Sequence, residues 1–323
     1  GWLWEMEDEI RPLVPMVYYH VWDNYPAPKF NSMFYDSTDV ITTISKLTDN
    51  VVREVTSKPD VIHVPHAVNT EIFKKLGSKE MADFREHSFQ NTEKNPDRLI
   101  FFWNNRNARR KQSGTLIFWF KEFLDRIGHD NACLIMHTDP KDQHGQDLEG
   151  IIHELGVDKG QVLVSKEKIP PGGLALLYNM ADCTINISDA EGFGLATLES
   201  LACETPIIVN MTGGLQEQVT DGEDWFGIGI EPCAKSIIGS QDIPYIYEDR
   251  LNKEQFIDAL QTFSNTTAEE RASLGKKGRA HVMKNYNFEN FQNAWPKILT
   301  EIYEKHGSWE NRKNYKSWRF ENL

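Results

Sequence analysis

SDAEGFGLATLESL, residues 188–201, places two glycines between two glutamates at a point where a strand gives way to a helix. The preceding run, CTINIS (183–188), predicts a buried strand, and apolar residues recur at helical spacing from Leu195 onward. Gly192 and Gly194 lack a Cβ, so a ligand can approach the backbone closely. The start of this helix would present free N–H groups and the positive end of its dipole. The stretch therefore predicts an anion site, best suited to a phosphate.

Strands of this kind alternate with helical patterns along the chain. The expected strands are 15–21, 39–45, 61–68, 98–103, 132–137, 161–165, 183–188 and 206–210. The helices expected between and after them include 46–55, 115–127 and a final amphipathic helix that ends at His306. Such alternation indicates βαβ units and parallel sheets. We therefore expect an α/β protein with two Rossmann-like, doubly wound domains that face a cleft.

A polar segment, 73–97, separates the two series and is interpreted as a linker with a short helix. The expected parts are 1–90, a partial N-terminal domain with this linker; 91–285, a second domain; and 286–323, a C-terminal helix and tail that cross back to the first domain. The first domain is short, and we expect it to be truncated. The open edge of its sheet would then favour self-association with another chain.

The composition excludes several classes of partner and site. The 323 residues include 35 basic and 48 acidic side chains, for a formal charge of −13, which argues against nucleic acid or an anionic membrane as the main partner. The four cysteines are scattered without a CxxC pair, which predicts reduced, buried thiols. No run approaches the roughly 18 apolar residues of a membrane helix, and no signal peptide is evident. We therefore expect a cytoplasmic protein.

A second motif, WNNRNARRKQSG (103–114), gathers four basic side chains within six residues. It follows an expected strand, where a basic loop suits a diphosphate: Arg forms bidentate contacts and Lys provides a point charge. Most charge runs are instead solvated loops. We favour this second interpretation for Arg109 and Arg110, and expect Arg106 and Lys111 to be ligands. Taken alone, the two glutamates of the first motif also have an ordinary interpretation, as a cap and a solvated helix residue.

These motifs together resemble the retaining glycosyltransferases of the GT-B fold, family 4 (glycosyl transferases group 1). The resemblance extends from about Pro15 to Tyr286 and is strongest over 181–219, which is similar to the family's E-x₇-E block and the Gly-Gly…Glu that follows it. It implies transfer of a hexose from a nucleotide-diphosphate sugar, GDP-mannose-like or UDP-glucose-like, to a hydroxyl acceptor. The acceptor, whether glycan, lipid or protein, is left open.

The resemblance also implies catalytic roles. Glu191 is similar to the family glutamate that contacts donor-sugar hydroxyls. Arg106 and Lys111 resemble the pair that stabilises the departing nucleoside diphosphate. His20, at a strand end, resembles the histidine that faces the donor sugar from the first domain, although such a histidine is often only a structural partner.

The donor-binding residues follow in the same way. Backbone amides of Phe193, Gly194 and Leu195 would meet the sugar and phosphate, and Glu199 would bind the ribose. Ser165 and Lys166 fall near the expected position of the base.

The expected mechanism needs neither a cofactor nor a metal. Cleavage of the anomeric C–O bond places negative charge on the diphosphate, which Arg106, Lys111 and the helix N-terminus would stabilise. No DxD-type element is evident, because Asp139 and Asp142 are separated by two residues. The alternatives are a catalytically silent nucleotide-sugar binding module, a truncated fragment that needs another chain, and another GT-B enzyme such as an epimerase or phosphorylase.

Overall fold

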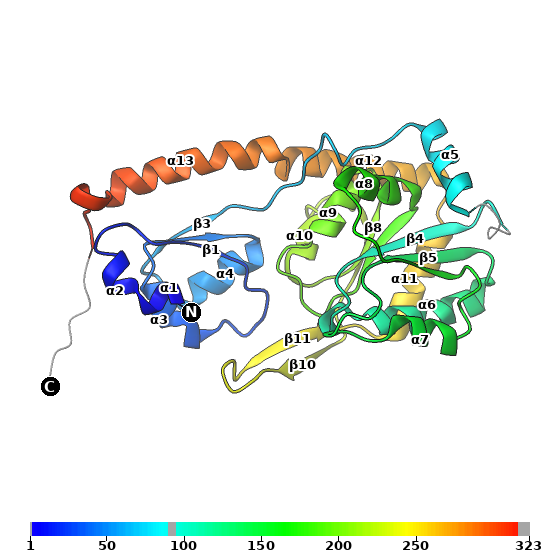
Figure 1. Cartoon of the computed structure of the whole chain (residues 1–323), viewed down its shortest axis with the longest axis horizontal. Coiled ribbons are helices and arrows are strands. Elements are labelled where there is room, and N and C mark those ends of the chain that lie inside the picture. Colours follow the sequence, from blue (N-terminus) through cyan, green and yellow to red (C-terminus); the bar gives the residue numbers. More distant parts are fainter. Residues whose placement is uncertain (1, 90–94, 316–323) are drawn as a thin grey trace. The chain divides into compact units, whose positions relative to one another are not determined.

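The structure is a computed structural model that describes residues 2–89 and 95–315 (Figure 1). The chain forms two compact units. Unit 1 consists of Gly1–His66, Ile237–Tyr247 and Phe288–Leu323, and unit 2 of Ala67–Ser236 and Glu248–Asn287. The expected domain boundary at residue 90 and the end of the expected tail, 316–323, lie outside the described residues.

Unit 1 contains a parallel sheet with the strand order β1-β2-β3. Its strands are β1 (Val17–His20), β2 (Val40–Thr43) and β3 (Asp60–His63). Its helices are α1 (Trp2–Glu5), α2 (Glu7–Ile10), η1 (Lys29–Asn31), α3 (Ser32–Asp36), α4 (Lys46–Val55), α13 (Phe288–His306) and η4 (Trp309–Asn311), where η denotes a 3₁₀ turn.

The alternation of side chains along β2 explains how helices cover both faces of this sheet. Val40 packs against α13, whereas the next residue, Ile41, packs against Tyr35 of α3 and Val52 of α4. Because successive strand residues point to opposite faces, a fully apolar strand needs a helix on each side. The sheet of unit 1 is therefore a three-layer arrangement.

Unit 2 contains a parallel sheet of six strands in the order β6-β5-β4-β7-β8-β9. Its strands are β4 (Leu99–Asn104), β5 (Ala132–His137), β6 (Val162–Ser165), β7 (Cys183–Asn186), β8 (Ile207–Asn210) and β9 (Gly227–Ile230). Its helices are α5 (Ser78–Phe89), η2 (Arg109–Lys111), α6 (Ser113–Ile127), α7 (Leu148–Glu154), α8 (Pro171–Met180), α9 (Leu195–Ala202), η3 (Gly213–Leu215), α10 (Gln216–Val219), α11 (Lys253–Ser264) and α12 (Ala268–Asn285). A separate two-stranded sheet consists of β10 (Ala234–Ile238) and β11 (Ile246–Arg250), and residues 237–247 of this segment are assigned to unit 1.

The order of the six strands is that of a doubly wound sheet. The chain runs outward from β4 through β5 to β6, and then returns to the other side of β4 with β7, β8 and β9. Helices α6, α7 and α11 cover one face, and α8, α9 and α12 cover the other (Figure 1). The order reverses between β4 and β7. In such sheets, ligands bind outside the carboxyl ends of the strands at this switch point.

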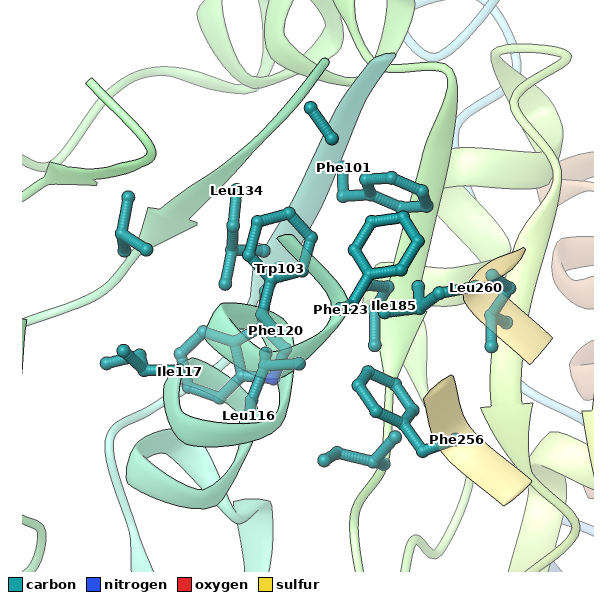
Figure 2. Close-up of a cluster of buried hydrophobic side chains, with 14 of the residues drawn as sticks. Phe101, Trp103, Leu116, Ile117, Phe120, Phe123, Leu134, Ile185, Phe256 and Leu260 are labelled. Carbon is teal, nitrogen blue, oxygen red and sulfur yellow. The ribbon is translucent and has the colours of Figure 1, made fainter. Parts of the chain in front are cut away.

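An aromatic core fixes α6 against the sheet of unit 2 (Figure 2). The ring of Phe101 on β4 meets Phe120 and Phe123 of α6 edge-on, at centroid distances of 5.7 and 5.9 Å. Trp103 and Phe256 are fully buried in the same cluster. Leu116 and Ile117, nearer the start of α6, belong to the cluster too, so the basic segment between β4 and α6 is anchored at both ends.

One expectation about the cysteines needs correction. Cys133, Cys183 and Cys203 are buried, but the expectation that all four thiols are buried is wrong, because Cys233 is exposed. This residue lies between β9 and β10, outside the apolar layers, and its backbone N–H donates to the Arg250 carbonyl at 2.9 Å. Among the described residues, no helix combines the length and apolar character that spanning a membrane requires.

Candidate functional site

The loops after β4 and β7 bring together two charged residues that are 80 positions apart in the sequence. The Lys111 Nζ donates to Glu191 Oε2, and the two side chains are only 10% and 11% exposed. Lys111 ends the η2 turn that leads into α6, and Glu191 precedes α9. The strand order therefore places one predicted phosphate ligand and one predicted sugar ligand in direct contact.

Glycine is required at the entrance to α9. Gly194 occupies the N-cap position with φ +94°, a conformation that favours glycine, and it provides no side-chain cap. A Cβ there would lie 2.7 Å from the Leu215 side chain and 2.9 Å from Thr197 Oγ1. The uncapped first turn of α9 is thus suited to an anion. Phe193 is buried beside this turn, whereas the Leu195 side chain is exposed.

A second glycine-containing segment holds the loop of Glu191 from behind. The Gly214 N–H donates to the Glu191 carbonyl at 2.9 Å, and a Cβ on Gly213 would overlap that carbonyl oxygen. Gln218 donates through Nε2 to the Phe193 carbonyl at 2.8 Å. The Gly-Gly…Glu part of the motif thus fixes the backbone that carries Glu191.

Arg109 and Arg110 have protein partners. Arg109 forms a bidentate ion pair with Glu248, with N–O distances of 2.8 and 2.7 Å, and Arg110 donates to the Ala190 carbonyl. The expectation that neither arginine is a ligand stays a prediction.

Arg106 lies on the same loop but is directed to a different partner. Its side chain is 60% exposed and forms a two-point ion pair with Asp142, at 2.6 and 3.1 Å. Its Nη2 also lies 2.8 Å from His144 Nδ1. The hydrogen bonds from Arg106 hold the pKa of Asp142 well below its usual range. A phosphate role for Arg106 stays a prediction, and it requires the guanidinium to leave or share Asp142.

Glu199, on α9, belongs to a short chain of side-chain hydrogen bonds. The Tyr178 hydroxyl donates to Glu199 Oε2 at 2.7 Å and accepts a hydrogen bond from Asn104 Nδ2 at 2.9 Å. Burial raises the pKa of Glu199 to about 7, although the hydrogen bond from Tyr178 acts in the opposite direction. The carboxyl group is therefore poised to change charge near neutral pH.

Ser165 and Lys166 lie farther along the carboxyl edge of the sheet. Asn104, His137 and Ser165 are paired in register at the ends of β4, β5 and β6. His137 Nδ1 lies 3.0 Å from Ser165 Oγ, and burial lowers the pKa of this histidine. The Lys166 side chain is 62% exposed and forms an ion pair with Glu149 at 2.6 Å.

His20 belongs to unit 1 and ends β1. Its ring is buried, its Nε2 lies 2.6 Å from the Tyr35 hydroxyl, and its Nδ1 has no hydrogen-bond partner among the described residues. Burial lowers the pKa of His20 to about 4, so the ring is neutral at pH 7. Its predicted contact with a donor sugar would therefore be a hydrogen bond and not an ion pair.

Several of these residues were not predicted from the sequence. Asn104 and His137 are the last residues of their strands, and the rule that ligands gather at carboxyl ends points to both. Tyr178 and Gln218 lie on helices, and no sequence pattern shows that their side chains reach Glu199 and Phe193. Within the described ranges, no group of three or more His, Cys, Asp or Glu is arranged to hold a metal ion.

Sequence comparison gives this geometry a family context. A D-inositol 3-phosphate glycosyltransferase of Corynebacterium jeikeium (strain K411) is 31% identical over 200 residues, which cover 61% of this chain and 42% of that protein. The N-acetyl-alpha-D-glucosaminyl L-malate synthase of Bacillus anthracis is 23% identical over 279 residues, covering 85% of this chain and 64% of that protein. The chain thus spans less than two thirds of the length of these curated relatives.

Solved structures agree on the fold. Sucrose-phosphate synthase from Thermosynechococcus elongatus matches with a TM-score of 0.66 at 23% identity, covering 85% of this chain and 61% of that one. HepE from Anabaena, in complex with UDP and glucose, matches with a TM-score of 0.68 at 12% identity, covering 88% of this chain and 71% of that one. The predicted GT-B fold is confirmed. Residues 83–281 match the family Glycosyl transferases group 1, and the chain belongs to this family.

Proposed function

We propose that this chain is a retaining glycosyltransferase that moves a hexose from a nucleoside-diphosphate sugar to a hydroxyl acceptor without a metal. The contact between Lys111 and Glu191 at the switch point carries the proposal. A cation beside an uncapped helix N-terminus suits a diphosphate, and an adjacent carboxylate suits the hydroxyls of the attached sugar.

In this proposal the donor takes the place of an internal ion pair. The diphosphate binds between Lys111 and the first turn of α9, so that Lys111 exchanges the Glu191 carboxylate for phosphate oxygens. Glu191 then accepts hydrogen bonds from the sugar hydroxyls. The ribose lies against Glu199. The two glutamates therefore bind different parts of the same donor molecule.

The chemistry follows from where charge develops. The bond between the anomeric carbon and the phosphate oxygen breaks, and its electron pair leaves with the diphosphate. Lys111 and the α9 dipole stabilise the growing negative charge. The acceptor oxygen forms a new bond to the same face of the anomeric carbon, and its proton passes to the departing phosphate. Retention is thereby obtained without a covalent enzyme intermediate.

The relatives support a nucleotide-sugar donor. The curated relatives include several D-inositol 3-phosphate glycosyltransferases, and HepE has been solved with UDP-glucose as well as with UDP and glucose. The donors to test first are accordingly UDP-glucose and GDP-mannose, which differ in both base and sugar. The acceptor classes to test are glycans, lipids and proteins.

The experiment measures release of UDP from UDP-glucose and of GDP from GDP-mannose, each with the sugar radiolabelled, in the presence of acceptor fractions of these three classes. Release with label in an acceptor supports the proposal. Tight donor binding without release in any fraction would leave a nucleotide-sugar binding module, and absence of binding to both donors would contradict the proposal. Lys111→Ala should abolish this release. Lys121→Ala is its matched control, because Lys121 also belongs to an ion pair, with Asp125 on α6.

A further inference from the structure

Asp189, two residues before Glu191, is a buried carboxylate with several partners. Its side chain is 3% exposed. It accepts hydrogen bonds from Arg250 Nη1 and, at 2.6 Å, from Gln112 Nε2. Its backbone N–H donates to the Arg110 carbonyl at 2.8 Å. Asp189 therefore joins the loop of Glu191 to the segment that contains Lys111 and to the end of β11.

A second carboxylate completes the cluster. The Glu248 side chain, 2% exposed, receives the bidentate pair from Arg109 and lies 3.3 Å from Arg250 Nη2. Two carboxylates and two guanidinium groups thus alternate in one network. Removal of Arg250 would leave the buried Asp189 carboxylate with only Arg109, 3.9 Å away, as a cationic partner among the described residues, which is costly.

The end of β11 also contacts the glycine-containing segment. The Asp249 N–H donates to the Asp189 carbonyl at 3.0 Å, and the Asp249 carboxylate accepts a hydrogen bond from the Thr212 hydroxyl at 2.8 Å. Thr212 directly precedes the glycine that would overlap the Glu191 carbonyl if it carried a Cβ. Residues 248–250 therefore contact all three segments that surround the Lys111–Glu191 pair.

We propose that Arg250 is a positioning residue of the donor site, which acts through Asp189 to hold the loop of Glu191 against the segment of Lys111. Arg250 itself contacts neither Lys111 nor Glu191 in these interactions. Its effect is to fix the separation of the two groups before a donor arrives. The proposal rests on the proposed function for its catalytic meaning. The contacts of Arg250 with Asp189 and Glu248, here called the clamp, are a property of the unliganded chain.

The first test uses the chain without ligand. Amide hydrogen exchange is measured for peptides covering 108–114 and 187–194 in the wild type and in Arg250→Gln. We expect faster exchange in both segments, with little change in β5 or in the rest of α6. Arg126→Gln is the matched control, because Arg126 pairs with Glu254 near the far end of α6, about 20 Å along the helix from its start. Unchanged exchange in the two segments of Arg250→Gln would overturn the proposal.

The second test asks whether the clamp acts through Lys111. Titrations with UDP and with GDP should show at least about tenfold weaker binding by Arg250→Gln. In a Lys111→Ala background, the same substitution should weaken binding by less than about twofold, because coupled residues are not additive. Equal losses in both backgrounds would show a general structural effect and overturn the positioning role.

Two further variants keep the test interpretable. Arg250→Lys retains a cation that can reach Asp189 and should recover part of the affinity; it replaces Arg250→Gln if that variant does not fold. The pair Asp189→Asn with Arg250→Gln removes both charges and should restore slow exchange relative to Arg250→Gln alone. If the wild type binds neither UDP nor GDP, the proposed function fails, whereas the exchange measurements still decide whether the clamp exists.

Discussion

Two parts of the carboxyl edge of the sheet in unit 2 differ in how deeply their charged side chains are buried. At the switch point, Lys111 and Glu191 are nearly buried, directly paired and fixed by backbone hydrogen bonds from neighbouring segments. At the ends of β5 and β6, His137 and Ser165 form one hydrogen bond at 3.0 Å, and the Lys166 side chain is exposed. The first part is a nearly buried ion pair held by its neighbours, and the second combines a hydrogen bond between uncharged groups with an exposed ion pair.

This difference suggests why different parts of one sheet edge suit different parts of a donor. Preorganised charge is most effective where charge develops during a reaction, since the groups need not reorganise at the transition state. A base has no net charge and needs only a surface and a few hydrogen bonds. We therefore expect substitutions at the switch point to change turnover greatly and substitutions at the outer strands to change nucleotide preference slightly.

The largest effect is expected for Lys111→Ala. Loss of the cation that stabilises the departing diphosphate should lower turnover by about a thousandfold and also weaken UDP or GDP binding. Release of nucleoside diphosphate and isothermal titration measure the two effects. Turnover within a few-fold of the wild type, or an equal loss in Lys121→Ala, would show that Lys111 is not the phosphate ligand.

Glu191→Gln should separate catalysis from nucleotide binding. We expect turnover to fall about a hundredfold, because a hydrogen-bonding partner of the sugar is altered in the transition state. UDP itself should bind at least as tightly as before, because Lys111 no longer pairs with a competing carboxylate. Titration with UDP measures whether the affinity is unchanged or higher, as expected. Weaker UDP binding by Glu191→Gln would contradict the exchange of partners that we propose for Lys111.

Glu199 should make nucleotide binding depend on pH. Its pKa is raised to about 7 by burial, and ribose hydroxyls donate best to the ionised carboxylate. The affinity for UDP should therefore rise, by several-fold, between pH 6 and pH 8. Because a phosphate of UDP also titrates near this range, Glu199→Gln is the control: only the part of the rise that it removes belongs to Glu199.

The raised pKa of Glu199 predicts that stability falls with rising pH, whereas UDP affinity rises. Since the folded pKa of Glu199 lies above its ordinary value of 4.5, the native state binds more protons than the unfolded state between about pH 4.5 and pH 7. The contribution of Glu199 to the free energy of unfolding should therefore fall as pH rises through this window. Urea unfolding of the wild type and Glu199→Gln checks it, and identical pH slopes would contradict the raised pKa.

The smallest effects are expected at the outer strands. The ion pair of Lys166 with Glu149 is exposed, and such pairs contribute about 0–1 kcal/mol. Ser165→Ala and Lys166→Ala should each change UDP or GDP affinity by less than about threefold, while altering the ratio between the two. Titrations with both nucleotides measure this ratio. A loss as large as that of Lys111→Ala would remove the distinction between the two parts of the edge.

Much of the fold could be predicted from the sequence because local patterns determine it. The strand ACLIMH is β5 (Ala132–His137), and the final amphipathic pattern is α13 (Phe288–His306), both as expected. The strands β9, β10 and β11 were not predicted. β9 (Gly227–Ile230) is glycine-rich, and the side chains of β10 (Ala234–Ile238) are largely exposed, so neither has the apolar pattern of a buried strand.

The candidate site was predictable only in part, for a similar reason. Lys111 and Glu191 could be proposed because strand ends meet at one edge of a parallel sheet. The partners of Asp189 could not, because its contact with Arg250 joins residues 61 positions apart through a segment without a recognisable pattern. Arg106 shows the same limit: its pairing with Asp142 depends on where the loop after β5 folds back.

The most direct test of the central claim is a crystal structure of the chain with bound UDP or GDP, whichever binds more tightly. We predict that the diphosphate lies between Lys111 Nζ and the first-turn amides of α9, that Glu191 no longer pairs with Lys111, and that the ribose hydroxyls contact Glu199. A nucleotide bound with its diphosphate away from the carboxyl ends of β4 and β7, or with the Lys111–Glu191 pair intact, would contradict the account.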